Sequence, residues 1–568
     1  MMKKCFYILL IVLVLPLCDA AAYYRLVNAG KQGLQAYTID RVLRLQDDQI
    51  DIGTAALLLS RQWSNEKSVH KYRLKLDGMA TDILKQLDKK NIRPSDVRAV
   101  AVINAYLYEE TGFSSLDTAD NPEDLFLHNV IDTRRGYCLS LSVLYLAIGE
   151  RIGLPLYGVV VPGHFFVRYD DGRVRLNIET TSMGRSADDA HYTEKFKPPQ
   201  DKDSLYMKNL SKRQTLGCFF NNLGNSYSAV GEIDNAQLEL ERAIAINPNL
   251  AEAHTNLGNI YLKKGWATDA VNHYLRSLQI INTDPKTHNN LANGYGYLGY
   301  FQKAVSAYRE AIRLQPDFAD AYRNLANTYL RQGQTNNALI ELRNALRLDG
   351  NDVDSILLLG DVYREMKNYG AAIAQYTRSL QIAPGWTSAH TNLAYCYYET
   401  DFLADAVRHF TEAIALDPSN TGAYFGLALT YDKLGHTEHE IDTYRQLLAV
   451  EPAVPAALQN LGNAYIALKA YPEAADCYRR AIQYQPDNSG LRYNLGVAYG
   501  NMESYDQAIT AYLDAVHIDP KNASAHNALA ISYYMVKNHA AALKHAQIAG
   551  RLGFNVQKEL LDVLENSQ

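Results

Sequence analysis

The sequence predicts a protein in two parts, an N-terminal α+β domain followed by an all-α array of helical hairpins. Residues 23–195 combine apolar residues at helical spacing with short strand-like runs. From residue 217 to residue 556 the chain instead repeats one pattern every 34 residues, which indicates a repeat array. A chain of 568 residues is long enough to hold both parts.

The beginning of the chain predicts an exported protein. Two lysines precede an apolar run from Phe6 to Leu17, which as a helix would reach about 18 Å and is too short for a hydrocarbon core of about 30 Å. Small residues follow, so residues 1–22 are typical of a secretory signal peptide. Attachment of a lipid at Cys18 is one alternative, and an uncleaved membrane anchor is the other. We therefore expect a periplasmic or secreted protein that contacts a membrane only through such a lipid.

Composition excludes several classes of function. The formal net charge is −6 and the basic residues form no long block, so we expect no nucleic-acid partner. The sequence shows no clustered metal ligands and no glycine loop of the kind that holds phosphate, so we predict neither a metal nor a cofactor. Three cysteines fall in separate repeats and are predicted to be packed thiols rather than disulfide partners: Cys218, Cys396 and Cys477.

Within the N-terminal domain, helices are predicted first and strands last. An apolar helix that starts at Cys138 should end at Gly153, because Gly-Leu-Pro is typical of a helix end. Three short strands follow, LYGVVV, HFFVRY and VRLNIET. The charged, proline-containing stretch EKFKPPQDKDS then leads into a predicted linker of residues 196–216, which connects the domain to the repeats. The earlier helices are predicted at residues 38–46, 53–63, 69–87 and 96–113.

The Asp171-Gly172 dipeptide predicts a tight two-residue turn between the last two strands. With that loop, the numbers of paired residues sum to 343, so His164 lies directly opposite Glu179 while Asn177 is a diagonal neighbour. Directly paired side chains share one face of a sheet. The sequence therefore predicts that Glu179 orients His164.

A cysteine, a histidine and a carboxylate together can support thiol chemistry. Cys138 begins a helix, whose partial positive charge favours a thiolate, and Arg134 and Arg135 precede it. His164 can hold a proton near neutral pH, and Glu179 would fix its orientation. For each residue a structural explanation is the alternative: a core cysteine, a loop histidine and a solvated carboxylate.

The stretch "RRGYCLSLSVLYLAIGERIGLPLYGVVV…PGHFFVRYDDG…LNIETT" resembles the transglutaminase-like superfamily. The shared pattern is Gly-x-Cys opening a helix, then Gly-Leu-Pro, a strand histidine and a strand acid before threonine, and it covers roughly residues 95–185. The resemblance implies a papain-like α+β core. It also implies that Cys138 is the nucleophile, His164 the base and Glu179 the residue that orients the base.

The C-terminal part is defined by ten leucines at intervals of 34 residues. Alanine follows thirteen positions later in nine of the ten units, Glu440 being the exception, and proline follows twenty-five positions later in seven. Small residues let two helices approach closely, and proline ends the second helix of each pair. The leucines are Leu223, Leu257, Leu291, Leu325, Leu359, Leu393, Leu427, Leu461, Leu495 and Leu529.

This pattern resembles the tetratricopeptide repeat family, with ten copies over residues 217–556 and a polar capping helix at residues 557–568. The family implies a superhelix whose concave face binds a peptide or a protein segment. Asparagine precedes the repeat leucine in seven units, and an amide can both donate to and accept from a peptide backbone. The alternative is that these side chains bond within the repeat. They are Asn222, Asn256, Asn290, Asn324, Asn392, Asn460 and Asn494.

Two functions follow from the sequence. The first is an exported thiol hydrolase or acyltransferase, such as a cysteine protease or an amidase, that acts on an amide or isopeptide and is joined to a protein-binding array. The second is a non-catalytic assembly scaffold with an inactive transglutaminase-like domain. Hydrolysis, deamidation and crosslinking share the same first step and are not separated by sequence.

Overall fold

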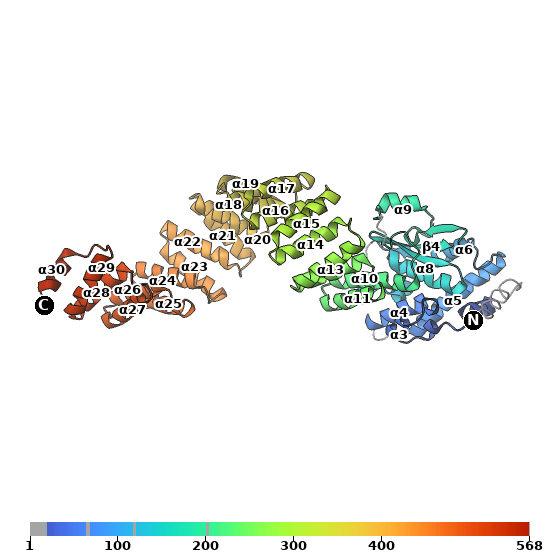
Figure 1. Cartoon of the computed structure of the whole chain (residues 1–568), viewed down its shortest axis with the longest axis horizontal. Helices are drawn as coiled ribbons and strands as arrows, with labels where there is room; N and C mark the ends of the chain where they lie inside the picture. Colours follow the sequence, from blue (N-terminus) through green and yellow to red (C-terminus); the bar gives the residue numbers. More distant parts are fainter. Residues whose placement is uncertain (1–19, 64–68, 118–120, 200–203, 567–568) are drawn as a thin grey trace. The chain divides into compact units, whose positions relative to one another are not determined.

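The computed structural model describes residues 20–63, 69–117, 121–199 and 204–566. The chain, which is drawn whole in Figure 1, divides into two compact units, Met1–Thr328 and Tyr329–Gln568. Most of the predicted signal peptide, including Cys18, lies outside the described residues, so that prediction stays a prediction. No helix in the described part of the chain has both the length and the apolar character needed to cross a bilayer.

The first unit opens with helices that form one side of the domain. Three of them, α2, α4 and α5, contact the central helix α8 (Cys138–Ile152). The helix predicted at residues 96–113 is present but changes to a π-helical turn after Asn104. These elements are α2 (Ala20–Asn28), η1 (Gln32–Gln35), α3 (Ile39–Leu43), η2 (Asp47–Gln49), α4 (Ile52–Trp63), α5 (Val69–Lys89), α6 (Ala99–Asn104) and η3 (Ala105–Glu110).

A three-stranded antiparallel sheet in the order β3-β4-β5 lies against α8. The predicted helix from Cys138 is confirmed: it is almost entirely buried and ends where Gly153 adopts the left-handed conformation. The elements around it are β1 (Ser114–Ser115), η4 (Pro122–Leu125), α7 (Leu127–Thr133), β2 (Arg135–Gly136), β3 (Leu156–Val161), β4 (His164–Asp170), β5 (Arg175–Ile178), η5 (Thr180–Ser182) and α9 (Asp189–Phe196).

The predicted register of the last hairpin is wrong by two residues. Asp170 pairs with Arg175, so the loop has four residues instead of two, and Glu179 is not directly opposite His164. The reason lies in Asp171, whose carboxylate accepts hydrogen bonds from the backbone N–H of Val174 at 2.7 Å and of Arg173 at 2.9 Å, closing a wider turn. A shift of two residues keeps every side chain on its predicted face.

A buried arginine holds several helices of the domain together. The Arg151 side chain has no exposed surface, and its guanidinium donates to both carboxylate oxygens of Asp51, at 3.0 and 3.1 Å. It also donates to Asp77 at 2.9 Å, and the hydroxyl of Tyr24 on α2 donates to that same carboxylate at 2.6 Å. This network joins α2, α4, α5 and α8, although their sequences are far apart.

The domain continues into the repeats without a break in its core. Gly158 on β3 pairs with Leu210, and α10, the first helix of the array, begins at Lys212, within the predicted linker of residues 196–216. The backbone N–H of Arg213 donates to Asp47 at 2.9 Å. Buried residues of the domain and of the first two repeats form one continuous hydrophobic cluster.

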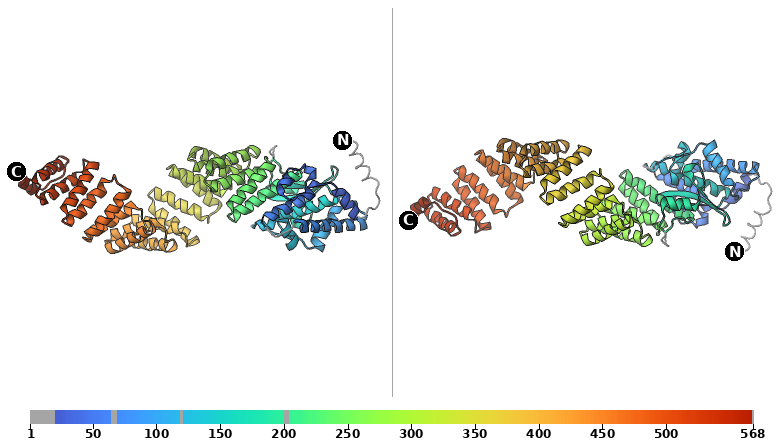
Figure 2. Two further views of the ribbon diagram at one scale, coloured as in Figure 1. Left: turned by 90° about the horizontal axis from the view of Figure 1, so that it is seen from below. Right: turned by 90° about the horizontal axis from the view of Figure 1, so that it is seen from above.

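The array consists of antiparallel helix pairs, seen from two further sides in Figure 2. Helix α16 contains the boundary between the two compact units. The pairs are α10 (Lys212–Ala229) and α11 (Ile233–Ile246), α12 (Ala251–Lys263) and α13 (Ala267–Ile280), α14 (Pro285–Tyr297) and α15 (Phe301–Leu314), α16 (Ala319–Arg331) and α17 (Thr335–Leu348), α18 (Val353–Glu365) and α19 (Tyr369–Ile382), α20 (Thr387–Glu399) and α21 (Leu403–Leu416), α22 (Thr421–Leu434) and α23 (Thr437–Val450), α24 (Pro455–Ala467) and α25 (Tyr471–Tyr484), α26 (Ser489–Asn501) and α27 (Tyr505–Ile518), and α28 (Ala523–Met535) and α29 (His539–Arg551).

The 34-residue pattern is explained by how each pair packs. In the fifth repeat a Cβ added to Gly360 would lie 2.5 Å from a ring atom of Tyr376, so the small residue makes room for the aromatic ring. The alanine of the pattern is buried as well, for example Ala372. At the one unit that departs from this pattern, Glu440 is also buried, and burial raises its pKa to about 7. A final helix, α30 (Lys558–Asn566), follows the last pair.

Candidate functional site

Cys138 occupies the first turn of α8, where backbone N–H groups give the helix end a partial positive charge. The preceding residue, Tyr137, is extended and begins the helix. The cysteine is buried, with 4% of its surface exposed. Its position at the helix start is as predicted.

His164 is the first residue of β4 and follows a turn in which Gly163 has a φ of 70°. Its Nε2 lies 2.7 Å from Oε2 of Glu179, so the ring donates to the carboxylate. The structure thus brings His164 and Glu179 together despite the shifted register, because both side chains remain on one face. With Nε2 engaged, Nδ1 is the ring nitrogen left to exchange a proton with Cys138.

The carboxylate of Glu179 is held by several donors. Its Oε1 accepts from the hydroxyl of Thr181 at 2.7 Å and from the backbone N–H of the same residue at 3.2 Å. Its Oε2 accepts from the hydroxyl of Tyr192 at 3.3 Å in addition to His164. Burial by itself would raise the pKa of Glu179, but the hydrogen bond and charge of His164 and the bonds from Thr181 hold it below the usual value.

The electrostatics of the site favour a charged histidine. Burial alone would lower the pKa of His164, but hydrogen bonds to Cys138 and Glu179, with the negative charges of both groups, raise it to about 9. Next to the cysteine, the pKa of Tyr137 is raised to about 12, first by the negative charge of Cys138 and then by burial. At neutral pH the imidazole is therefore protonated.

A hydroxyl chain fixes the strand end against the cysteine helix. The hydroxyl of Thr180 lies 3.4 Å from the carbonyl oxygen of Cys138 and 3.0 Å from the hydroxyl of Ser142. The carbonyl of Thr180 in turn accepts from Tyr108 at 3.1 Å. These contacts hold the residue after Glu179 in a fixed position relative to α8. Sequence reasoning missed them, because small polar residues at a strand end carry no specific signal.

Helix α9 covers the histidine and was also missed. The ring of Phe196 stacks on His164, with centroids 5.1 Å apart and planes 1° from parallel, while Tyr192 stacks on Phe166 at 3.9 Å. The helix is anchored by Asp189, which accepts from the buried Arg168 at 2.6 Å. The spacing of Tyr192 and Phe196 places both on one helix face, which is the signal that could have identified a covering helix.

The predicted asparagine ladder makes hydrogen bonds inside the protein. In each of the seven side chains the amide NH2 donates within the array. The alternative interpretation, a bond within the same repeat, describes only Asn222, because the other six reach the preceding repeat. Binding of a peptide by the same residues stays a prediction. The bonds run from Asn222 to the carbonyl of Cys218 (2.9 Å), Asn256 to Asn221 (2.8 Å), Asn290 to Asn259 (3.0 Å), Asn324 to Asn289 (3.1 Å), Asn392 to Asp361 (3.0 Å), Asn460 to the hydroxyl of Tyr444 (3.0 Å) and Asn494 to Asn463 (3.5 Å).

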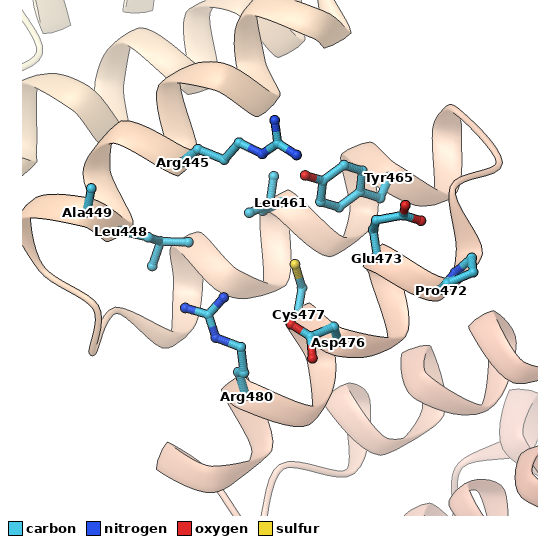
Figure 3. A pocket seen from close by; sticks show the side chains of 10 residues that line it. All are labelled: Arg445, Leu448, Ala449, Leu461, Tyr465, Pro472, Glu473, Asp476, Cys477 and Arg480. Atoms are coloured by element: carbon cyan, nitrogen blue, oxygen red, sulfur yellow. The ribbon is translucent and has the colours of Figure 1, made fainter.

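A cavity of about 600 Å³ lies in the second unit, between α23, α24 and α25 (Figure 3). It is lined by mixed charges, including Arg445, Arg480, Glu473 and Asp476, and by the sulfur-bearing Cys477. Burial raises the pKa of the Cys477 thiol to about 11, so this cysteine is a packed thiol at neutral pH. In the described part of the chain no three His, Cys, Asp or Glu side chains gather as a metal-ligand set.

Comparison with known families matches both parts of the chain. A family model described as the transglutaminase-like superfamily matches residues 70–218. Models described as TPR repeat and tetratricopeptide repeat match residues 224–265, 251–284, 295–333, 317–385, 421–454, 462–503 and 502–536.

Individual proteins are similar to parts of the chain. A UPF0162 protein of Xylella fastidiosa is 28% identical over 219 residues, 37% of this chain and 76% of the relative. F-box only protein 21 of Mus musculus is 36% identical over 72 residues, 12% of this chain and 11% of the relative. Among solved structures, PilF of Pseudomonas aeruginosa is 19% identical and covers 39% of this chain and 98% of its own, with a TM-score of 0.34. YrrB, described as a TPR protein with an unusual peptide-binding site, is 20% identical and covers 32% and 95%, with a TM-score of 0.28.

Proposed function

Because the chain joins a transglutaminase-like domain to an array of tetratricopeptide repeats, we propose that it is a thiol-dependent hydrolase or acyltransferase. Its substrate would be an amide or isopeptide. The observation that carries the proposal is the contact of 2.7 Å between His164 and Glu179, beside a cysteine at a helix start. These three groups supply a nucleophile, a proton carrier and an orienting carboxylate.

The chemistry proceeds in two stages. The Cys138 thiolate attacks the carbonyl carbon, a C–S bond forms, and the tetrahedral intermediate collapses as the C–N bond breaks. The imidazolium of His164 gives its proton to the leaving amine. Water or a second amine then attacks the thioester, loses its proton to His164 and releases Cys138. Glu179 stays ionised throughout and stabilises the charged imidazole.

The repeats support a role in protein–protein interaction. Under the proposal, the array binds a protein or a peptide segment through its concave face, where the seven asparagines of the ladder would contribute. The signal-peptide pattern of residues 1–22 supports export to the periplasm or the outside of the cell, with a lipid at Cys18 as the alternative anchor.

Thiol labelling tests the site directly. The mature protein is treated with iodoacetamide near neutral pH, and labelled peptides are quantified by mass spectrometry. We expect Cys138 to react first and the reaction to slow at least tenfold in the His164→Ala variant, because the imidazolium no longer stabilises the thiolate. Three cysteines of the same chain serve as internal controls, since burial raises the pKa of each: Cys218, Cys396 and Cys477.

If Cys138 in a folded sample reacts no faster than a free thiol, the enzyme proposal fails. The chain is then better described by the second function, a non-catalytic scaffold. The same spectra identify the mature N-terminus, so the export proposal is tested in parallel.

A further inference from the structure

Three repeats each contain a pair of histidines in direct contact. In every pair one histidine lies on the first helix of the repeat and the other on the second, and the two Nδ1 atoms are 2.9–3.1 Å apart. The pairs recur every fourth repeat, in the second, sixth and tenth units. They are His254 with His273, His390 with His409, and His526 with His545.

The first histidine of each pair is held in one tautomer. Its Nε2 contacts a backbone carbonyl oxygen of the preceding turn, that of Pro248 at 3.1 Å, Pro384 at 3.1 Å or Pro520 at 3.2 Å. A carbonyl oxygen can only accept, so Nε2 carries the hydrogen and Nδ1 presents its lone pair to the partner ring. A ring N–H bound to a carbonyl is the usual way in which proteins orient a metal-binding histidine.

The second histidine is positioned by a tyrosine of the first helix. The ring centroids lie 5.3 Å apart for Tyr261 and His273, and 5.7 Å apart for Tyr397 with His409 and for Tyr533 with His545. These second histidines are partly exposed, so the pair can be reached from solvent. Each repeat thus presents two oriented imidazoles at an accessible surface.

The two rings of each pair share one hydrogen between their Nδ1 atoms. A metal ion can bind both Nδ1 atoms only when that hydrogen has left them. Moving it to the second ring's Nε2 would free both Nδ1 lone pairs for one ion. At His409 the guanidinium of Arg408, which donates to Nε2 at 3.3 Å, must first turn away.

The distance between the two Nδ1 atoms of a pair can be compared with the distances expected for different metal coordination geometries. Two nitrogens bound at about 2.1 Å to one metal lie about 3.0 Å apart when their bonds are at right angles, and about 3.4 Å apart in a tetrahedron. The observed 2.9–3.1 Å is a hydrogen-bond distance that lies close to the right-angle value, so the two rings can bind one ion in the geometry that Ni²⁺ and Cu²⁺ prefer without moving apart. We propose that the three histidine pairs are binding sites for Ni²⁺ or Cu²⁺, one ion per pair.

Each site offers two protein ligands, because the described residues contain no third His, Cys, Asp or Glu at the pairs that would complete a ligand set. Water fills the other positions, and binding is correspondingly weak. Charge ranks the sites: at the second repeat Asp269 and Glu241 act on His273 and are opposed by Arg276 at His254, whereas Asp405 is opposed by Arg408 at His409. At His545 the neighbouring charge is Lys544. We expect affinity to fall from the second repeat to the sixth and then the tenth.

The test is calorimetric titration of Ni²⁺ into the full mature chain, produced without a polyhistidine tag. We expect three ions per chain, and two in each variant in which one second histidine becomes asparagine: His273→Asn, His409→Asn or His545→Asn. Asparagine keeps a donor for the partner ring, so the helices stay joined. Circular dichroism confirms folding of each variant.

The chain provides a matched control in its third repeat. His288 occupies the same position and its Nε2 contacts the carbonyl oxygen of Asn282 at 2.9 Å, but the partner position holds Ala307. The His288→Asn variant should therefore bind as many ions as the native chain. The proposal is overturned if the native chain takes up no Ni²⁺, or if a folded variant with all three substitutions binds as much as the native chain.

Discussion

The domain and the array use polar contacts in opposite ways. In the domain, groups distant in sequence converge on single points: Arg151 reaches Asp51, and His164 reaches Glu179. In the array one contact is repeated between neighbours, such as the hydroxyl of Tyr274 donating to Asn259 at 2.8 Å. When a contact of the domain is lost, no equivalent contact replaces it. A contact of the array is one of many equivalent contacts in successive repeats. Substitutions should therefore have large effects in the domain and graded effects in the array.

The largest effect is expected from Arg151→Ala. The change leaves Asp51 buried and without its guanidinium, which costs about 3–5 kcal/mol in the free energy of unfolding. Differential scanning calorimetry should show the transition of the first unit at a lower temperature and that of the second unchanged. The exposed hairpin residue Arg173, changed to alanine, is the control. Equal shifts in both transitions would contradict the contrast between the two regions.

A second large effect, on activity, is expected from Glu179→Gln. The pKa of His164 is raised to about 9, so the proton needed by the leaving amine is present below that pH and lost above it. Without the carboxylate charge the alkaline limb of the kcat profile should move to lower pH, and kcat should fall about 10²-fold. If the alkaline limb of the kcat profile stays at the same pH in Glu179→Gln, Glu179 does not act on His164.

The same shift gives a stability prediction with a defined sign. A raised pKa in the folded state means that the charged His164 stabilises the fold fully below its ordinary pKa of about 6.5. That contribution is lost as pH rises through about 9. Urea unfolding of the native protein and of Glu179→Gln at pH 6 and pH 10 should differ more at the lower pH.

A moderate effect is expected from Gly360→Ala in the array. The added methyl would lie 2.5 Å from the Tyr376 ring, and overpacking of this kind costs about 1–3 kcal/mol. The matched control is Gly370→Ala on α19, where a Cβ meets nothing within 4 Å. In differential scanning calorimetry, the unfolding transition of the second unit should broaden or move to a lower temperature in Gly360→Ala. In Gly370→Ala its temperature should stay the same or rise.

The smallest effect is expected from Tyr376→Phe. Its hydroxyl donates to Asp361 at 2.6 Å, and this carboxylate also accepts from Asn392 in the next repeat and pairs with Arg364 at 3.9 Å, so it keeps polar partners in the variant. The loss should be about 1 kcal/mol, measured by urea unfolding. The exposed Tyr484, changed to phenylalanine, should have almost no effect. A loss as large as that of Arg151→Ala would mean that the array is not a series of independent contacts.

Sequence predicted what depends on periodicity and on local signals. The 34-residue interval identified the helix pairs, and the apolar run ending at Gly153 identified the cysteine helix. The hairpin register failed because Asp171 closes the wider turn with its own side chain, a choice that the dipeptide does not encode. The side of the sheet on which each side chain lies was still predicted correctly, because a register shift by an even number of residues leaves every side chain on the same side.

Contacts that depend on tertiary placement were not predictable. The position of Phe196 over His164 requires knowing where α9 docks, and its sequence shows only which residues share a helix face. The ladder asparagines recur at one position of the repeat in the sequence, but their acceptors lie mostly in the preceding repeat. The acceptor of each amide can be identified only when the packing of neighbouring repeats is known.

The pairing of β3 with the segment just before the array has a consequence for aggregation. The backbone N–H of Met207 donates to Val160 at 3.1 Å, and that of Leu210 to Gly158 at 2.9 Å, so residues 207–210 occupy the outer edge of the sheet. A fragment that stops before residue 204 would leave these strand groups unpaired, and an open edge of this kind recruits strands from other chains. The segment that joins the domain to the repeats thus protects the domain from self-association as well as connecting the two parts.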